Sequence, residues 1–262
     1  MFDVPRSTYN SYRQRLLILD MERIRLRARV ASIHRKSRGS AGARTICGVL
    51  NQSGESIGLF KVRRLMSEQN LSSKQPGPKR FKVANKPSNV ANNTLNREFT
   101  IERPNHVWCG DVTYLWSGTQ WLYLALVIDL FSRRIVGWAI SDSPDTTLTN
   151  KALTTAYYSR GKPKHVLFHS DQGCHYTSYQ YQQSLTDFKM IQSLSRRGNC
   201  WDNAPMERVF RTLKTEWIPE IGYESVNQAT TDVFAFIRYY NFIRGHSYNN
   251  YATPAEVEKA FK

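Results

Sequence analysis

Residues 107–141 read VWCGDVTYLWSGTQWLYLALVIDLFSRRIVGWAIS, and this stretch decides the fold class of the chain. Val107–Trp116 predicts a first strand, and Ser117-Gly118 is a turn signal. Trp121–Ile128 is an unbroken apolar run, as expected for a central strand that is buried on both faces. Arg134–Ser141 predicts a third strand. We therefore expect three consecutive strands connected as a meander.

The chain beyond this meander alternates between helices and strands. The sequence predicts helices over Thr146–Tyr158, Thr177–Leu185 and Asn203–Trp217, and short strands over His165–His169 and Met190–Ser193. Three strands followed by alternating helices and strands is the order of a ribonuclease-H-like domain. The expected fold class is therefore α/β, with a mixed five-stranded sheet flanked by helices.

Three carboxylates lie at positions of this domain that suit an active site. Asp111 lies within the first strand among Trp, Val, Tyr and Leu, where a charge is costly to bury unless it is paired or binds metal. Asp171 follows the fourth strand in the small polar loop His169-Ser170-Asp171-Gln172-Gly173, and such loops carry active residues. Glu207 lies in the first turns of a helix that Asn203 is expected to cap and Pro205 to begin.

The helix that contains Glu207 has two stripes of side chains. One stripe is apolar and is expected to pack inward; it consists of Met206, Phe210, Leu213 and Trp217. Glu207, Arg211 and Lys214 fall on an adjacent face, because seven residues make about two helical turns. The carboxylate therefore shares its side of the helix with two cations, which suits a metal ligand beside a DNA backbone.

Carboxylates suit the cleavage and transfer of phosphodiester bonds. The transition state is crowded and negative, and two Mg²⁺ ions about 3.5–4 Å apart can activate the attacking oxygen and stabilise the leaving one. Mg²⁺ prefers oxygen ligands and keeps several waters, so three carboxylates suffice. A single Asp or Glu is usually a surface charge. The hypothesis therefore depends on Asp111, Asp171 and Glu207 together.

Charge is unevenly distributed along the chain, whose formal net charge is +16. Residues 1–104 hold 21 Lys and Arg against 7 Asp and Glu, whereas residues 105–262 hold 16 against 14. A basic front half joined to a nearly neutral back half indicates a nucleic-acid-binding part attached to a separate working domain. The alternative is a basic surface that serves only solubility.

The first 70 residues are predicted to be helical. Ala43–Leu50 predicts a short helix, and after a turn Ile57–Asn70 predicts another, with Lys61, Arg63 and Arg64 outward. This pair fits a helix-turn-helix with a basic second helix; a helical hairpin for protein contacts is the alternative. Before it, Tyr12–Ser37 places apolar residues on one helical face, namely Leu16, Leu17, Leu19, Met21, Ile24, Leu26, Val30 and Ile33.

Two further segments complete the chain. Residues 71–104 are rich in Ser, Pro, Asn and Lys and predict a linker, whose cations either follow a phosphate backbone or only solvate a tether. Residues 218–262 predict a helical tail in which Ser225 caps a helix that runs to Tyr240 and Pro254 begins a last short helix. The residues of the tail expected to face inward are Val233, Phe234, Phe236 and Ile237.

The carboxylates and the sequence around them resemble a known family. Thirty-five residues separate Asp171 from Glu207, and Lys214 follows Glu207 by seven, as in the D,D,E signature of insertion-sequence transposases and retroviral integrases. The segments VWCGDVTYLW, LYLALVIDLFSRRIVGWA, FHSDQGCHYTS, SRRGNCWDNAPMERVFRTLKTEW and YYNFIRGHSYNNYATPAE closely resemble the second open reading frame of insertion-sequence family three. The resemblance covers nearly the whole chain.

The resemblance implies that four segments of the chain have different roles. Residues 1–70 are expected to bind DNA through the helix-turn-helix, 71–104 to form a basic linker, 105–217 to form a ribonuclease-H-like catalytic core, and 218–262 to form a helical tail. In the core, Asp111, Asp171 and Glu207 are expected to bind Mg²⁺ or Mn²⁺, with two ions in the site. The residues expected to contact DNA are Lys61, Arg63, Arg64, Arg196, Arg197, Arg211 and Lys214.

The family further implies a reaction and partners. The enzyme is expected to nick the ends of an insertion sequence with water and to join the freed 3′-hydroxyl to another DNA strand. Terminal repeats, target DNA, an upstream-frame fusion partner and a dimer or larger assembly on DNA are the implied partners. Two alternatives are a DNA-binding regulator of transposition without catalytic activity, and a ribonuclease-H-like nuclease without strand transfer.

The apolar runs, the N-terminus and the cysteines of the chain indicate where the protein is located. No apolar run approaches the length of a membrane span, and Met1 is not followed by a signal peptide, which favours the cytoplasm. The family resemblance implies association with the bacterial nucleoid. The four cysteines form no CxxC pair and are expected to be reduced thiols rather than zinc ligands.

Overall fold

The computed structural model describes residues 5–17, 20–74 and 91–261, and a five-stranded sheet lies at its centre. The strands are β1 (Val107–Trp116), β2 (Trp121–Asp129), β3 (Arg134–Ser141), β4 (Leu167–Ser170) and β5 (Ile191–Leu194). Their order is β3-β2-β1-β4-β5, with β1, β2 and β3 antiparallel and β4 parallel to both β1 and β5. The predicted meander and the mixed five-stranded sheet are confirmed.

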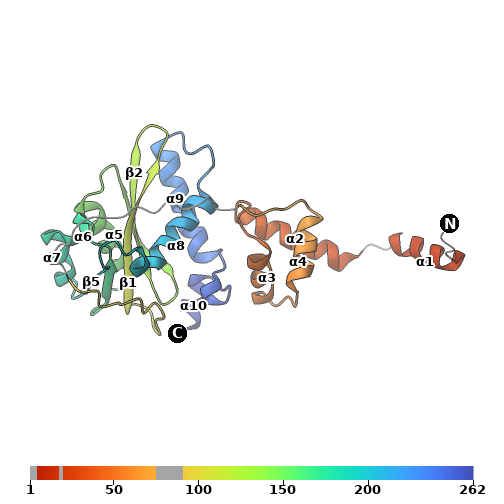
Figure 1. Ribbon diagram of the computed structural model, residues 1–262, viewed down its shortest axis with the longest axis horizontal. Coiled ribbons are helices and arrows are strands. Elements are labelled where there is room, and N and C mark those ends of the chain that lie inside the picture. The colour runs from red at the N-terminus through yellow and green to blue at the C-terminus, as the bar shows by residue number, and fades with distance from the viewer. Residues whose placement is uncertain (1–4, 18–19, 75–90, 262) are drawn as a thin grey trace.

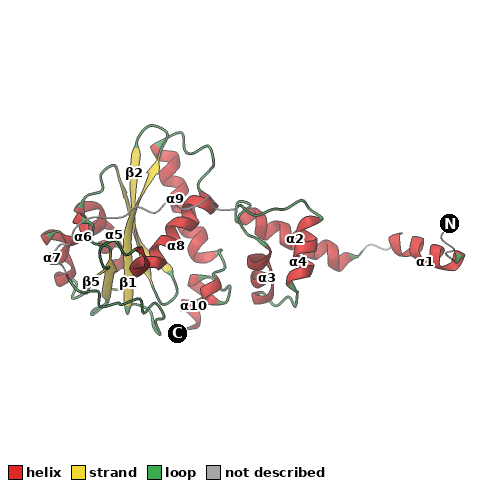
Figure 2. Ribbon diagram, in the orientation of Figure 1, coloured by secondary structure: helices red, strands yellow, loops and turns green. Residues whose placement is uncertain are grey.

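Helices cover both faces of the sheet (Figures 1 and 2). On one face pack α5 (Thr146–Ser159), α6 (Cys174–Thr177) and α7 (Tyr179–Asp187). On the other pack α8 (Ala204–Thr212), its π-helical continuation η2 (Leu213–Trp217) and α9 (Val226–Phe242). Strand β2 is buried on both faces, because Leu124, Leu126 and Ile128 contribute to one core while Ala125 and Val127 contribute to the other.

The N-terminal part is a separate bundle of helices with its own core. The bundle contains α2 (Met21–Lys36), α3 (Ala43–Gln52) and α4 (Leu59–Ser67), and α1 (Arg6–Leu17) precedes it and lies apart from it (Figure 1). The core of α2, α3 and α4 is formed by Leu26, Val30, Ile46, Leu50, Val62 and Leu65, among others. Helices α3 and α4, with the turn between them, have the arrangement predicted for a helix-turn-helix.

The continuous helical face predicted over Tyr12–Ser37 is wrong, because the chain forms two helices there. Asp20 begins α2 by accepting a hydrogen bond from the backbone of Arg23 at 2.9 Å. Met21 and Ile24 are exposed, since they lie five and two residues before Leu26 and a period of 3.6 turns them away from its stripe. The side chains of Leu16, Leu17 and Leu19, which were predicted to face inward, are not among those that the structure describes.

Other predicted helices differ in their details. The helix expected over Thr177–Leu185 is two, α6 and α7, because Ser178 caps α7 through the backbone of Tyr181. The helix expected over Asn203–Trp217 changes from α to π at Leu213. Strand β4 begins two residues later than predicted.

The C-terminal helices belong to the same packed body as the sheet. Ser225 caps α9 as predicted, and Val233, Phe236 and Ile237 are buried against the sheet. Phe234 is exposed, contrary to prediction, because it lies one residue off that stripe. After η3 (Ser247–Asn249), Thr253 and Glu256 form a capping box that begins α10 (Pro254–Ala260), confirming the predicted last helix.

The described end of the linker runs along β5. The backbone of Leu194 donates to the carbonyl oxygen of Asn92 at 3.3 Å, and the backbone of Leu95 donates to the hydroxyl of Ser193 at 3.1 Å. Lys79, Arg80, Lys82 and Lys86, proposed to follow a phosphate backbone, lie outside the described residues. Within the described chain, the search for helices of membrane-spanning length and apolarity finds none.

Candidate active site

Asp111 lies in β1, and Asp171 directly follows the neighbouring parallel strand β4 at a matching position. Cys109 of β1 pairs with His169 of β4, and each aspartate lies two residues further along its strand or strand end. Because side chains alternate between faces, Asp111 shares the face of Cys109, which packs in the core under α8 and α9. Neighbouring strands are about 4.8 Å apart, so this register brings the two carboxylates together.

Gly110 makes the close approach of these strands possible. A Cβ atom at this position would lie 2.6 Å from Cζ of Phe168 on β4 and 3.3 Å from the hydroxyl of Tyr176. No other residue type fits without displacing the Phe168 ring, which is fully buried. The residue before Asp111 is therefore determined by packing behind the candidate site.

Glu207 reaches the same region because the start of α8 is attached to β1. The segment η1 (Cys200–Asn203) precedes α8, and the side-chain amide of Asn203 donates to the carbonyl oxygen of Gly110 at 3.2 Å. Asn203 makes no capping hydrogen bond to α8, so its predicted role as a cap is wrong. Its actual role is to hold the first turn of α8, with Glu207 on it, beside Asp111.

Asp111 lies within the electrostatic field of the other two candidate carboxylates. Burial, together with the negative charges of Asp171 and Glu207, raises the pKa of Asp111 to about 8, while the backbone hydrogen bond from Val112 and the charge of Lys214 oppose the shift. The Asp171 carboxylate itself accepts a hydrogen bond from the backbone of Gly173 at 3.0 Å. A half-buried carboxylate surrounded by two others is a site with excess negative charge, which a cation would neutralise.

Lys214 is held next to this cluster by an aromatic ring. Its amine lies 4.3 Å from the centre of the Tyr114 ring, which follows Asp111 by three residues on β1. Desolvation lowers the pKa of Lys214, and the negative charge of Asp111 opposes that shift. The site therefore combines three carboxylates with one nearby cation that is positioned by a cation–π contact.

Comparison with known proteins decides the family. The family profile described as "Integrase core domain" matches residues 101–200, a second profile of that description matches 189–254, and the profile "HTH-like domain" matches 22–79. The transposase for insertion sequence element IS904 of Lactococcus lactis is 35% identical over 241 residues, which cover 91% of this chain and 95% of that protein. This chain belongs to the IS3 family of insertion-sequence transposases. It is therefore a DNA transposase whose catalytic domain is of the DDE, integrase-core type.

Further relatives are similar over most of their length. Transposase InsF for insertion sequence IS3A of Escherichia coli is 34% identical to this transposase over 227 residues, which cover 85% of this chain and 78% of that protein. Among solved structures, the HTLV-2 integrase catalytic core domain in complex with magnesium (trimeric form) has a TM-score of 0.44 and 18% identity, and the match covers 59% of this chain and 97% of that one.

The DNA-binding candidates of the transposase lie in two groups. On α4, Arg63 is exposed, while Lys61 pairs with Glu22 at 3.0 Å and Arg64 pairs with Glu68 at 3.2 Å. On the catalytic side, Arg211 and Lys214 are exposed on α8 and η2, and Arg197 is exposed in the loop before η1. The HTH-like match and the basic outer surface of α4 are consistent with DNA binding by this helix.

Arg196 has a structural role that the sequence did not indicate. It binds the fully buried Asp202 through its backbone and through both sides of its guanidinium, each at 2.9 Å. Asn93 and Arg97 bind the same carboxylate at 2.9 and 2.7 Å. This cluster ties the described end of the linker to the loop that leads into η1 and α8.

Other polar residues near the candidate site also have structural roles. His169 is fully buried and bridges the hydroxyls of Ser193 and Ser195, each at 2.9 Å. Asp129 is fully buried and accepts hydrogen bonds from the backbones of Asn105 and Phe131, so it stabilises the turn after β2. Trp201, in contrast, is 65% exposed.

Proposed function

We propose that Asp111, Asp171 and Glu207 are the catalytic carboxylates of this transposase. Three observations support the assignment: the register of β1 and β4, the hydrogen bond that fixes the start of α8 to Gly110, and the raised pKa of Asp111. The first of these carries the proposal, because each aspartate follows a residue of the paired strands by two positions.

We propose that these carboxylates hold divalent metal, Mg²⁺ or Mn²⁺, as two ions. The donor set fits, because all three ligands are carboxylates and hard cations prefer oxygen. Within the described residues, no three His, Cys, Asp or Glu side chains form a preassembled cluster of metal ligands. When bound, the ions would activate an attacking oxygen and stabilise the leaving one. The excess negative charge around Asp111 favours their binding.

The remaining groups of the site would orient DNA. Lys214, fixed over the Tyr114 ring, presents its ammonium group within the field of Asp111 and is placed to bind a phosphate next to the scissile bond. In the proposed reaction, water cleaves the end of the element, and the freed 3′-hydroxyl then attacks a second strand. Both steps exchange one phosphodiester oxygen for another, so no covalent bond between protein and DNA is needed.

We also propose which residues contact DNA, what each segment of the chain does and which partners the transposase has. Lys61, Arg63 and Arg64 on α4 would bind terminal-repeat DNA, whereas Arg196, Arg197, Arg211 and Lys214 would bind DNA near the carboxylates. Residues 1–70 would act as the DNA-binding part, 71–104 as the linker, 105–217 as the catalytic core and 218–262 as the tail. An upstream-frame fusion partner, assembly on DNA as a dimer or larger, and a place on the bacterial nucleoid complete the proposal.

A disintegration assay tests the catalytic assignment. The purified chain is mixed with a branched DNA that mimics the joined product, in Mn²⁺ or Mg²⁺, and resolution of the branch is measured. We expect resolution by the wild type and by the control Glu220→Gln, an exposed position, but not by Glu207→Gln, which should still bind DNA. If Glu207→Gln resolves the branch at the wild-type rate, the assignment is wrong. If no variant is active, the assay is repeated with the upstream fusion.

A further inference from the structure

Three aromatic side chains lie exposed together at the end of the β1–β2 hairpin. Tyr114, Trp116 and Trp121 are 57%, 46% and 49% exposed. The Trp121 ring is 5.3 Å from that of Tyr114 and 5.2 Å from that of Trp116, in edge-to-face contacts. Trp116 and Trp121 are directly opposite each other in the strand pairing. We call these three residues the hairpin aromatics.

The opposite face of the same hairpin is covered by protein. Leu115 and Leu122 are buried there, and Leu122 packs with Tyr223 and Ala229. Gly118 fixes the tip, because a Cβ atom there would lie 2.4 Å from the carbonyl oxygen of Tyr223. The hairpin aromatics are thus held on a rigid support while their own face stays open to solvent. A contiguous exposed group of large apolar side chains typically marks a binding surface.

The hairpin aromatics continue the strand that carries Asp111. Tyr114 follows Asp111 by three residues, so it lies roughly 10 Å further along β1, with its side chain on the opposite face of the sheet. In its described pairing with β1, β4 reaches only Val107–Cys109, and Asp111–Trp116 extends beyond it. Lys214 contacts the Tyr114 ring, which joins the surface to the cation of the site.

The chemistry of this surface fits the bases of DNA rather than its backbone. Residues 112–128 contain no Asp, Glu, Lys or Arg, so the hairpin itself offers no charge to a phosphate. Aromatic rings instead stack on the flat faces of bases, and every base has such a face. A second copy of the chain is a poorer fit, because each copy carries a formal net charge of +16.

We propose that Tyr114, Trp116 and Trp121 form a stacking surface for unpaired bases of the DNA strand next to the scissile phosphodiester. Bases in an intact duplex are already stacked on one another, so the surface selects DNA whose end is frayed or single-stranded. Lys214 then binds the adjoining phosphate while the bases lie on the rings. This inference rests on the proposed assignment of Asp111 to the catalytic site.

Binding in the absence of metal separates this inference from catalysis. The probes are a short duplex with fully paired ends and the same duplex with several mismatched terminal pairs, in EDTA. One unpaired position carries 2-aminopurine, whose fluorescence falls on stacking. We expect wild type to prefer the frayed duplex and to quench the probe. Trp121→Ala should lose about tenfold in affinity for the frayed duplex, little for the paired duplex, and most of the quenching.

Matched variants keep the test decisive. Trp121→Phe retains a stacking ring and should keep most of the preference. Tyr158→Ala removes another exposed tyrosine with a lysine over its ring, Lys162 at 5.2 Å, and should change nothing. If circular dichroism shows that Trp121→Ala does not fold, Tyr114→Ala is tested in its place. Glu207→Gln should keep the preference for frayed DNA; if it does so yet still resolves branched DNA, only the catalytic assignment fails.

Three results would overturn the stacking surface. In the first, Trp121→Ala and Tyr114→Ala keep the wild-type preference for the frayed duplex. In the second, they weaken binding to the paired and the frayed duplex equally. In the third, the two variants change the sedimentation of the chain without DNA but leave the preference intact, which would indicate that the hairpin is an interface between two copies. In each case wild-type cleavage would persist, so the proposed function would stand without this surface.

Discussion

Arg38, at the end of α2, and Asp232, on α9, form a two-pronged ion pair. Nη2 lies 2.5 Å from one carboxylate oxygen and Nη1 lies 3.0 Å from the other. The same guanidinium lies 3.8 Å from the centre of the Trp217 ring and donates to the Trp217 carbonyl oxygen at 2.9 Å. One side chain therefore attaches the N-terminal bundle to Trp217, at the end of the helix that carries Glu207.

We predict that Arg38→Ala loosens this attachment. Loss of charge-assisted hydrogen bonds to Asp232 should weaken the docking by about 1–3 kcal/mol, although both cores stay folded. Hydrogen exchange should become faster around α2 and α9. The control is Arg25→Ala, because its partner Glu55 lies within the same bundle and keeps Arg29. Unchanged exchange in Arg38→Ala would show that apolar contacts alone hold the two parts together.

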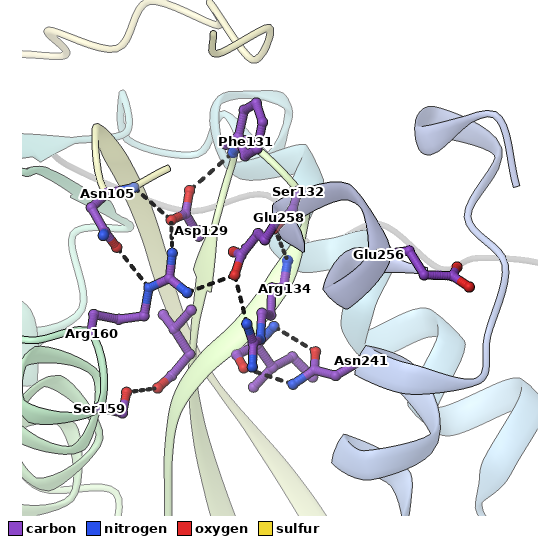
Figure 3. Close-up of polar contacts among 12 residues, drawn as sticks. Asn105, Asp129, Phe131, Ser132, Arg134, Ser159, Arg160, Asn241, Glu256 and Glu258 are labelled. Carbon is purple, nitrogen blue, oxygen red and sulfur yellow. Dashed lines mark hydrogen bonds and ion pairs between the residues drawn. The ribbon is translucent and has the colours of Figure 1, made fainter. Parts of the chain in front are cut away.

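We predict that Arg160→Ala is strongly destabilising. Arg160, at the end of α5, binds Asp129 at 3.3 Å and Glu258 of α10 at 2.7 Å, so it joins three parts of the chain (Figure 3). Its loss leaves two buried carboxylates with fewer partners, which typically costs about 3–5 kcal/mol. Urea unfolding measures the change, and Lys162→Ala is the control nearby. A loss below about 1 kcal/mol would mean that Arg134 alone satisfies Glu258.

We predict that Asp202→Asn destabilises the loop before Glu207. Hydrogen bonds from Arg196 hold the pKa of the buried Asp202 well below its usual range, with Arg97 adding to the effect. A lowered pKa in the folded state means that the stabilisation is complete above about pH 4 and is lost as the pH falls below that value. Urea unfolding should therefore show wild type about 2 kcal/mol more stable than Asp202→Asn at neutral pH. The difference should shrink progressively in acid; a constant difference would contradict the ionised pair.

The sequence predicted the sheet because its signals are local. The unbroken apolar run of β2 reflects two buried faces, and the loop after β4 placed Asp171 at a strand end. Helix boundaries were less certain where a polar side chain decides them, as Asp20 does for α2. The capping box at Thr253 left a clear signal, because it lies within one helical turn.

The supports of the site left no such signal, because they join distant parts of the chain. Asn93 and Asp202 are 109 residues apart, and Asn203 binds a carbonyl oxygen 93 residues before it. Neither periodicity nor capping rules describe such contacts, so Asn203 was interpreted as a helix cap. Likewise, nothing local indicates that Lys214 lies over Tyr114. The candidate site residues could therefore be proposed from a sequence pattern, whereas the residues that position them could be identified only from the fold.

The last prediction concerns Asp111, whose pKa is raised to about 8 by burial and by the charges of Asp171 and Glu207. In the unfolded chain its pKa is about 4. Between these values the folded state holds a proton that the unfolded state has lost, so Asp111 makes the protein less stable as the pH rises from about 4 to 8. Asp111→Asn removes this penalty, and without metal it should be more stable than wild type at pH 8 by an amount on the order of a few kcal/mol.

Added Mg²⁺ should reverse that order. Binding to the ionised carboxylates stabilises the wild type in proportion to metal concentration, whereas Asp111→Asn lacks one negative ligand and should respond weakly. Thermal unfolding of both proteins in EDTA and in Mg²⁺, at pH 6 and pH 8, measures the effect, with Asp142→Asn as the control at an exposed carboxylate. The wild-type response to Mg²⁺ should be larger at pH 8, because less of Asp111 must first lose its proton. Equal responses of wild type and Asp111→Asn to Mg²⁺ would exclude Asp111 as a metal ligand.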